Sequence, residues 1–326
     1  MTRVLVTGGA GFIGSHVCGA CLAAGEEVVV VDNLATGSEE NLPPEVRFVR
    51  GDLRDPELAG FLMKEFRPDA VYHLAAQSSV VKSTGDPTLD MSVNVTGTLR
   101  MLEACRAADP HPVFIYASTG GAIYGDPVMA PVGEDYPVEL RSPYGASKHA
   151  AEHYVSVYAK LFGFQAVSLR FANIYGPRQR GDLEAGVISI FSRLLVDGRP
   201  VTLYGNGKAA RDYVYVADAV EAMRLAGRLG APGGAYNVGT GVATRVEEVL
   251  GLVARALGRE PVEVRREPLR PGEVFHISLD SARLQAQTGW RPRRTLEAGI
   301  AAFAEWFLGA QALAGASATN GQKPAK

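Results

Sequence analysis

Several features that define other classes of protein are scarce or absent in this sequence. Only three of the 326 residues are cysteine, an odd number too small for a disulfide framework, so a reducing compartment, the cytoplasm, is expected. No apolar run reaches the roughly 18 residues of a membrane span, and the N-terminus lacks the apolar core of a signal peptide. The formal net charge of -2 gives no electrostatic reason to expect a nucleic acid or a membrane as a partner.

A metal site is not expected either. The one Cys-x-x-Cys pair, Cys18 and Cys21, lies in a predicted helix, with no second pair and no histidine cluster near it. Two buried, small apolar side chains are the simpler interpretation of this pair. What is present is an ordinary globular composition, 47% hydrophobic and 21% charged, in a chain long enough for about two domains.

Short β-branched runs alternate with helical patterns over the first part of the chain. Strands are predicted at residues 3–6, 27–31, 46–49, 70–74, 113–117 and 166–171. Amphipathic stretches between them, such as 12–24 and 86–107, predict helices. Because the run from Val28 to Val31 is apolar on both sides of the strand, both faces of the sheet must be covered. The alternation predicts an α/β fold built on a doubly wound, Rossmann-like parallel sheet.

The pattern changes after about residue 174, where glycine and proline become frequent. Residues 174–212 and 240–308 are predicted to form a second, smaller α/β domain. Residues 213–239 are predicted to return to the first domain, which otherwise spans 1–173. From residue 309 to residue 326 no periodic apolar face remains, so a disordered tail is predicted.

A glycine-rich turn follows the first strand directly and leads into a helix. Gly8, Gly11 and Gly14 are spaced three apart, so the backbone can approach a pyrophosphate at the N-terminus of that helix. The second strand ends in Asp32, where an acidic residue can accept hydrogen bonds from an adenosine ribose. The first domain is therefore predicted to bind a dinucleotide. Because a carboxylate repels a 2′-phosphate, NAD rather than NADP is expected.

A Tyr-x-x-x-Lys pair lies at the start of a predicted helix at 143–162. A serine and a proline precede it, as at many helix starts, so Tyr144 and Lys148 share one face of the helix. The Lys148 ammonium is expected to lower the pKa of the Tyr144 phenol and make it a general base. The same spacing recurs at Tyr204 and Lys208, but around a Gly-Asn-Gly turn, where the two side chains need not be neighbours.

Two hydroxyl residues, Ser118 and Thr119, follow the strand at 113–117. Side chains at the carboxyl end of a parallel strand face the crevice in which such sheets bind ligands. Either hydroxyl could therefore orient a substrate hydroxyl toward Tyr144.

Taken together, these residues resemble the extended short-chain dehydrogenase/reductase superfamily. Within it, they resemble the NAD-dependent nucleotide-sugar epimerase/dehydratase family, above all its UDP-glucose 4-epimerases. The resemblance covers about residues 2–308. Further matches to the family's motifs are Asn33, Asp52-Leu53, His73-Leu74-Ala75-Ala76, Asn94, Asn173, Arg211-Asp212-Tyr213 and the run from Arg270 to Glu273.

The resemblance implies an NAD site that involves both the glycine turn and the Tyr-Lys pair. Asp52 and Leu53 would flank the adenine. Ala75 and Ala76 would line the pyrophosphate and nicotinamide side, and Lys148 would hold the nicotinamide ribose. The implied cofactor-binding residues are Gly8, Gly11, Phe12, Ile13, Gly14, Asp32, Asn33, Asp52, Leu53, Leu74, Ala75, Ala76, Asn94, Ser118, Tyr144, Lys148 and Phe171.

The resemblance also implies a UDP-sugar site. Thr119 would hydrogen-bond the reacting sugar hydroxyl and is favoured over Ser118, although the chain has one glycine more at this point than many relatives. Two arginines would bind the diphosphate, for which the guanidinium group is well suited. The implied substrate-binding residues are Thr119, Tyr144, Asn173, Val187, Tyr204, Arg211, Arg270, Glu273 and Ile277.

The implied reaction is NAD-dependent 4-epimerisation of a UDP-hexose through a transient 4-keto sugar. Gly120 and Gly121 stand where a 4,6-dehydratase carries an acid/base pair, so dehydration is not expected. A UDP-glucuronate 4-epimerase or decarboxylase is the alternative within the family, and an NAD-binding sensor without activity is the alternative from another class. Ile277, unless it is a core contact, predicts that UDP-N-acetylglucosamine is accepted besides UDP-glucose. A homodimer through the helices at 86–107 and 143–162 is also implied.

Overall fold

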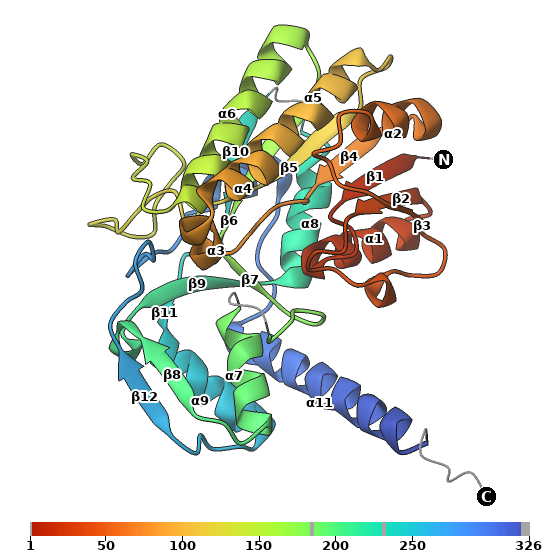
Figure 1. Cartoon of the computed structure of the whole chain (residues 1–326). Coiled ribbons are helices and arrows are strands. Elements are labelled where there is room, and N and C mark those ends of the chain that lie inside the picture. Colours follow the sequence, from red (N-terminus) through yellow and green to blue (C-terminus); the bar gives the residue numbers. More distant parts are fainter. Residues whose placement is uncertain (1, 183–185, 230–232, 321–326) are drawn as a thin grey trace, which may run out of the picture.

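The centre of the molecule is a parallel β-sheet, which confirms the predicted fold class. The computed structural model describes residues 2–182, 186–229 and 233–320 (Figure 1). Among these residues the larger sheet has seven parallel strands, in the order β10-β6-β5-β4-β1-β2-β3. They are β1 (Arg3–Thr7), β2 (Glu27–Asp32), β3 (Arg47–Arg50), β4 (Ala70–His73), β5 (Val113–Thr119), β6 (Ala166–Phe171) and β10 (Gly234–Val238). The strand order reverses between β1 and β4, the point at which doubly wound sheets bind their ligands.

Alternate residues of each strand pack on opposite faces of this sheet. Val28 and Val30 belong to one hydrophobic cluster, whereas Val29 and Val31 belong to another. Since side chains alternate across a strand, a run that is apolar throughout requires a covering layer on both sides. The covering helices are α1 (Phe12–Ala23) and α8 (Val216–Ala226) on one face, and α2 (Leu58–Phe66), α5 (Gly97–Ala107) and α6 (Pro143–Phe162) on the other.

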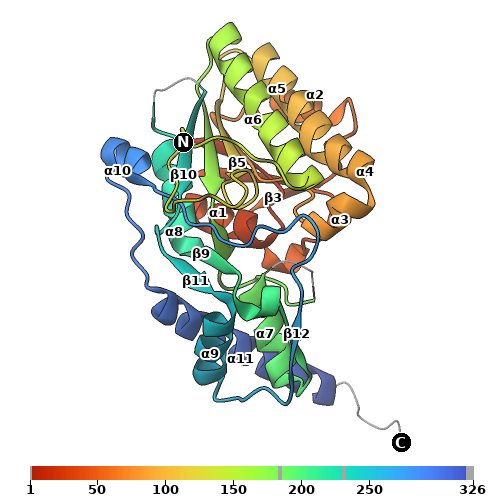
Figure 2. The same cartoon turned by 90° about the vertical axis from the view of Figure 1, so that its left-hand side faces the viewer.

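A smaller α/β unit lies beside the carboxyl ends of these strands (Figures 1 and 2). Its sheets, as far as the structure describes them, have the orders β11-β9-β7 and β12-β8. Their strands are β7 (Asn173–Tyr175), β8 (Val201–Tyr204), β9 (Ala210–Tyr215), β11 (Ala243–Arg245) and β12 (Val264–Glu267). The helices packed with them are α7 (Val187–Val196), α9 (Val246–Leu257) and α11 (Leu296–Asn320), whereas α10 (Ala282–Thr288) packs against β10. The short helices η1 (Glu39–Asn41) and η3 (Gly205–Gly207) lie in connecting loops.

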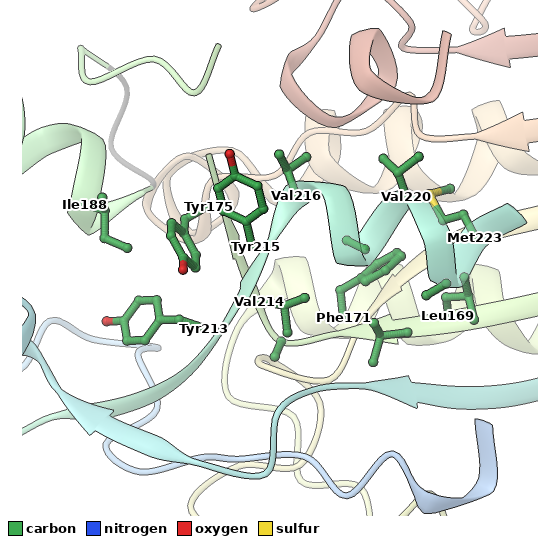
Figure 3. Packing of buried hydrophobic residues seen from close by; sticks show 14 of the residues in the cluster. Leu169, Phe171, Tyr175, Ile188, Tyr213, Val214, Tyr215, Val216, Val220 and Met223 are labelled. Carbon is green, nitrogen blue, oxygen red and sulfur yellow. The ribbon is translucent and has the colours of Figure 1, made fainter. Parts of the chain in front are cut away.

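Aromatic side chains fill the junction between the two parts (Figure 3). The Tyr175 ring meets the rings of Tyr213 and Tyr215 edge to face, with centroid separations of 6.4 and 5.6 Å. Phe171 and Val216 belong to the same hydrophobic cluster, which runs from the larger sheet into the smaller unit. Edge-to-face rings are a favourable geometry for such pairs. The two parts are therefore joined by continuous apolar packing, which holds the edge of the larger sheet against the smaller unit.

The helix predicted at 86–107 is divided in the structure. The segment consists of α4 (Pro87–Met91), a π-helical turn η2 (Ser92–Thr96), and α5. It is preceded by α3 (Val80–Gly85), which the sequence did not predict. A π turn is rare, and such turns are frequently found at functional sites. Here the π turn contains the buried Asn94.

The tail predicted to be disordered from residue 309 is helical as far as Asn320, so that part of the prediction is wrong. Ile300, Phe303 and Phe307 bury the first turns of α11 against the smaller unit. Once a helix is nucleated, each further residue adds a hydrogen bond at little cost, and the alanine-rich continuation has high helix propensity. Residues 321–326 of the predicted tail lie outside the described residues. No helix among the described residues is long and apolar enough to cross a membrane.

Candidate active site

The predicted site residues gather where the carboxyl ends of β1, β4, β5 and β6 face the smaller unit. This edge is fixed by the chain itself, because β6 is followed after one residue by β7, a strand of the smaller unit. Thr7 and His73 end β1 and β4 on either side of the point where the strand order reverses. Sequence segments more than a hundred residues apart therefore contribute to the same edge of the sheet.

The glycine-rich turn fits a pyrophosphate. Gly8 has a φ of +70°, and a Cβ at this position would lie 2.7 Å from the Ala75 backbone nitrogen. A Cβ on Gly14 would overlap the Gly8 carbonyl oxygen. The N-cap of α1 is Gly11, which has no side chain to bind the first N–H groups of the helix. These groups and the positive end of the helix dipole are left for an anion.

Asp32 is held rigidly at the end of β2. Its Oδ2 accepts a hydrogen bond from the Ala10 N–H at 3.1 Å, and its Oδ1 accepts one from the Leu34 N–H at 2.8 Å. Burial raises the pKa of this carboxyl group, and the two N–H donors oppose the rise. Each oxygen retains a lone pair for a ribose hydroxyl, so the position fits the predicted contact. Asn33 donates to Asp52 at 2.9 Å, which connects two further residues predicted for the adenosine side.

A buried histidine ties β1 to β4 beneath the glycine turn. Thr98 donates its hydroxyl to the Asn94 carbonyl, so its oxygen accepts from His73 Nε2 at 3.0 Å. His73 Nδ1 then accepts from Thr7 Oγ1 at 2.9 Å. Burial lowers the pKa of His73 to about 3, so the ring is neutral. A neutral ring satisfied on both sides has a structural role, and it positions Leu74 and Ala75 at the end of β4.

Tyr144 and Lys148 lie on the first turns of α6, as predicted. The Ser142 hydroxyl accepts from the Gly145 N–H at 3.1 Å and caps the helix, and the Tyr144 N–H donates to Ser83 Oγ in α3 at 3.1 Å. Lys148 is buried, with its ammonium 4.3 Å from the centre of the Tyr116 ring. A cation over an aromatic face is stabilised by the ring quadrupole, which partly offsets its desolvation.

The pKa values of this pair correct one expectation. Burial raises the pKa of Tyr144 to about 12, and the hydrogen bond with Thr119 opposes that rise. Burial lowers the pKa of Lys148 to about 7, against the opposing charges of Asp90 and Glu152. Lys148 therefore holds its proton less firmly than an exposed lysine does. The prediction that the Lys148 ammonium lowers the pKa of the Tyr144 phenol is wrong, because desolvation raises that pKa and the group that opposes the rise is Thr119.

The structure separates the two candidate hydroxyls. Ser118 Oγ donates to Glu152 Oε2 at 2.8 Å, and Glu152 forms a buried ion pair with Arg170. Thr119 instead has its side-chain hydrogen bond with Tyr144. The Ser118 hydroxyl thus belongs to the buried network of Glu152 and Arg170, whereas the Thr119 hydroxyl is hydrogen-bonded to the Tyr144 side chain.

Several residues predicted for the substrate lie together in the smaller unit. The Arg270 guanidinium lies 3.8 Å from the centre of the Tyr204 ring, and its Nη1 is 3.8 Å from Glu273 Oε1. Arg211 interacts electrostatically with Glu273 and donates to the Phe275 carbonyl at 3.1 Å. These residues come from β8, β9 and the segment after β12, which only the fold brings together.

The remaining predicted substrate residues are more scattered. A Cβ at Gly121 would lie 3.5 Å from Asn173 Oδ1 and 3.9 Å from Thr119 Oγ1, so these three positions adjoin. Val187 begins α7 and is partly buried. Ile277 is only 2% exposed and belongs to the main hydrophobic cluster, which favours the core-contact interpretation.

Some buried polar residues around the pair were missed from the sequence. The charge of Arg170 within an apolar strand was a signal, as was the spacing of Glu152 four residues after Lys148 on one helix. Gln77 and Asp90 gave no such signal, because only the fold brings them next to α6. No group of three or more metal-ligating side chains was found in the part of the chain that the structure describes.

A glycine turn, a carboxylate at the end of the second strand and a Tyr-Lys pair on a doubly wound sheet define a dinucleotide-dependent enzyme. The profile of the NAD dependent epimerase/dehydratase family matches residues 4–239. The UDP-glucose 4-epimerase of Mycolicibacterium smegmatis is 43% identical over 310 residues, covering 94% of this chain and 98% of the relative. The chain therefore belongs to the NAD-dependent epimerase/dehydratase family, and its cofactor is NAD.

Solved structures agree with this assignment. The Thermus thermophilus UDP-glucose 4-epimerase, solved in complex with NAD, has a TM-score of 0.90 and 49% identity, covering 95% of this chain and 100% of that chain. The Thermotoga maritima UDP-glucose 4-epimerase, solved with UDP-glucose, has a TM-score of 0.91 and 38% identity with the same coverage.

Proposed function

We propose that this chain catalyses the NAD-dependent 4-epimerisation of a UDP-hexose, with UDP-glucose and UDP-galactose as its first pair of substrates. The observation that carries the proposal is the pairing of Thr119 with Tyr144 beside two glycines. The 4-epimerases of known structure that resemble it over 95% of the chain support the same reaction.

In this reaction the chain's own residues move one proton and hold the sugar. Thr119 orients the 4-hydroxyl toward Tyr144, and the Tyr144 phenolate takes the hydroxyl proton. Lys148, when protonated, stabilises that phenolate. NAD, when bound, supplies a hydride acceptor for C4 and a positive charge that favours the phenolate. After the sugar has turned, Tyr144 returns its proton to the oxygen at C4, and the configuration at that carbon is inverted.

The two glycines restrict the chemistry to this exchange. Elimination of water from the keto sugar requires a second acid/base pair. Gly120 and Gly121 supply none, and the direction of a Cβ at Gly121 is toward Asn173 and Thr119. A side chain at position 121 would therefore enter the site. Without one, the keto sugar can only regain its hydride, which favours epimerisation over dehydration.

We propose that the cluster of Tyr204, Arg211, Arg270 and Glu273 binds the UDP group. Two arginines supply the donors that a diphosphate needs. Tyr204 would lie near the uracil and Glu273 would accept from its ribose, while Asn173 and Val187 would complete the pocket. The Arg270 guanidinium lies over the Tyr204 ring, and planar groups of this kind can stack on a planar base.

A product assay tests the function directly. The purified protein, without added cofactor, is expected to retain NAD and to interconvert UDP-glucose and UDP-galactose. UDP-glucuronate is assayed in parallel, because a 4-epimerase or decarboxylase acting on it is the alternative. UDP-N-acetylglucosamine tests the predicted breadth, and Ile277→Tyr should selectively suppress it if Ile277 is a pocket wall. Absence of bound NAD and of any product from all three sugars would contradict the proposal.

Asp32→Ala is expected to weaken NAD binding and to reduce discrimination against NADP. The variant removes the carboxylate that accepts from the ribose and repels a 2′-phosphate. Calorimetry of both dinucleotides with apo protein measures the change. Asp55→Ala, an exposed acidic residue in a loop, is the matched control and should leave both affinities unaltered. An unaltered preference in Asp32→Ala would mean that other residues hold the ribose.

We also propose that two copies associate through α5 and α6, which lie side by side on one side of the molecule (Figure 2). Tyr154, Val157 and Leu161 follow the outer face of α6 and are 42%, 52% and 69% exposed. Exposed apolar side chains that gather in this way are typical of an interface. A two-fold axis would bury this face of α6 in both copies against each other. Light scattering of the wild type and of Leu161→Glu tests this, with a monomeric wild type as the contrary result.

We also propose that the protein is located in the cytoplasm. The three cysteines are unpaired and buried, and burial raises the pKa of the Cys18 thiol to about 12. Protonated, enclosed thiols of this kind suit a reducing compartment. Cell fractionation is the corresponding measurement.

A further inference from the structure

Asp90 is a buried carboxylate that none of the roles above uses. It lies in α4 and is 1% exposed. Its Oδ1 accepts from Gln77 Nε2 at 2.7 Å and from Asn94 Nδ2 at 3.2 Å. Its Oδ2 is buried and has no hydrogen-bond partner among the described residues. Burying a carboxylate with one oxygen unsatisfied is costly unless a nearby cation compensates the charge.

The hydrogen bonds around Asp90 lead directly to the Tyr-Lys pair. Asn94 Nδ2 also donates to Ser147 Oγ at 2.9 Å, and Ser147 Oγ donates to the Tyr144 carbonyl at 3.1 Å. Asn94 reaches across because it lies in the π turn η2. The start of α6, which contains Tyr144 and Lys148, is therefore connected to Asp90 through two side chains.

The charged and titratable groups around Lys148 come from several packed elements. They are Asp90 of α4, Glu152 and Tyr144 of α6, Tyr116 of β5 and His73 of β4. His73 and the two tyrosines are neutral at neutral pH. Of the two carboxylates, Glu152 is paired with Arg170 at 2.5 Å, so its charge is already compensated. Asp90 has no ion pair among the described residues, and the cation on which its charge acts is Lys148.

We propose that Asp90 is a positioning residue that provides the counter-charge of Lys148, and that it thereby sets the pH range in which the Tyr144–Lys148 pair works. The inference rests on the proposed function for its kinetic test. The physical reason is that a nearby negative charge favours the protonated form of a buried lysine, against the cost of its desolvation. Because Asp90 is tied to Asn94 and Ser147, the same contacts hold that charge in place.

The sign of the effect follows from the two groups. Burial lowers the pKa of Lys148, and the Asp90 charge opposes this; the same charge adds to the raised pKa of Tyr144. Removing the charge should lower both pKa values. In the active form Tyr144 has lost its proton and Lys148 has kept its proton, so the two pKa values together set the two limbs of the kcat profile. Since both pKa values fall, both limbs should move to lower pH.

Asp90→Asn is the test variant, because the amide keeps the shape and the acceptor at Oδ1. The NH₂ group of the asparagine takes the place of Oδ2, and no hydrogen bond is lost there because Oδ2 accepts none from the described residues. The pH profile of kcat, measured with the NAD-bound protein, is expected to move down by about one unit on both limbs. Asp90→Glu keeps the charge, so its pH profile of kcat should lie closer to the wild-type profile than that of Asp90→Asn. The control is Glu65→Gln, an exposed charge on α2, which should move neither limb.

A second measurement does not depend on activity. The ultraviolet absorbance of the Tyr144 phenolate is titrated as the difference between each protein and its Tyr144→Phe counterpart, and the Asp90→Asn titration should lie at lower pH. If Asp90→Asn does not fold, Asp90→Ser is titrated instead. A uniform fall in kcat with unmoved limbs and an unmoved titration overturns the inference. A shifted titration in a protein with no epimerase activity would support it while contradicting the proposed function.

Discussion

Replacing Tyr144 with phenylalanine is expected to lower kcat about 10²–10⁴-fold, the usual contribution of a positioned acid/base group. The variant loses only a hydroxyl, so the fold and the bound NAD should be retained. The ring remains packed at the start of α6, where the Ser142 cap and the backbone hydrogen bond to Ser83 do not involve the phenol. Steady-state kinetics with UDP-glucose, with circular dichroism and NAD content as checks, measures the effect.

Two further tyrosines serve as comparisons for this variant. Tyr154→Phe removes only a hydroxyl on the outer face of the same helix, away from Thr119, and should leave kcat unchanged. Tyr204→Phe, in the second Tyr-x-x-x-Lys sequence, should change KM far more than kcat, because that side chain lies with Arg270 rather than with Thr119. If Tyr144→Phe kept more than a tenth of the wild-type kcat, Tyr144 would not be the base.

Replacing Arg170 with methionine is expected to lower the free energy of unfolding by about 3–5 kcal/mol, since it leaves a buried charge unpaired. The Arg170 guanidinium binds Glu152 through Nε at 3.0 Å and Nη2 at 2.5 Å. Its Nη1 donates to the Tyr124 hydroxyl at 2.7 Å and to the Glu134 carbonyl at 3.0 Å. All of these partners lose a donor at once, and urea unfolding monitored by fluorescence measures the loss.

The design of this second experiment separates charge from packing. The double variant Arg170→Met with Glu152→Leu removes both charges and should recover much of the stability, because an apolar pair can replace a buried ion pair. Arg265→Met breaks an exposed pair with Glu263 and should have no measurable effect. If Arg170→Met were as stable as Arg265→Met, the buried pair would not be important for stability.

The Arg170–Glu152 network also bears on the choice between the two hydroxyls. Ser118 is bound to Glu152 and cannot turn to a substrate without leaving a buried carboxylate short of a donor. Thr119, the next residue of β5, lies on the other side of the strand, toward Tyr144. The alternation of side chains along a strand therefore separates two adjacent hydroxyls into a structural residue and a candidate catalytic one.

Local elements and the motifs within them could be predicted from the order of the amino acids alone. The strand at 166–171 and the helix at 143–162 have the observed bounds, since apolar runs and a capped helix start are local signals. Gly8, Gly14 and Asp32 could be predicted for the same reason, because a strand, a tight turn and a helix define their relation within about thirty residues.

The surroundings of Tyr144 and Lys148, in contrast, depend on contacts that form only when the chain is folded. Asp90 and Gln77 come from other segments of the chain, and no spacing in the sequence relates them to Lys148. The directions of the Tyr144 and Lys148 pKa shifts could not be predicted for the same reason, since they depend on burial and on the charge of Asp90 in α4. The π turn at Asn94 was invisible because it is stabilised by hydrogen bonds across elements rather than by local propensity. Sequence periodicity reports contacts within one element, whereas pKa values and buried polar networks are set by contacts between elements.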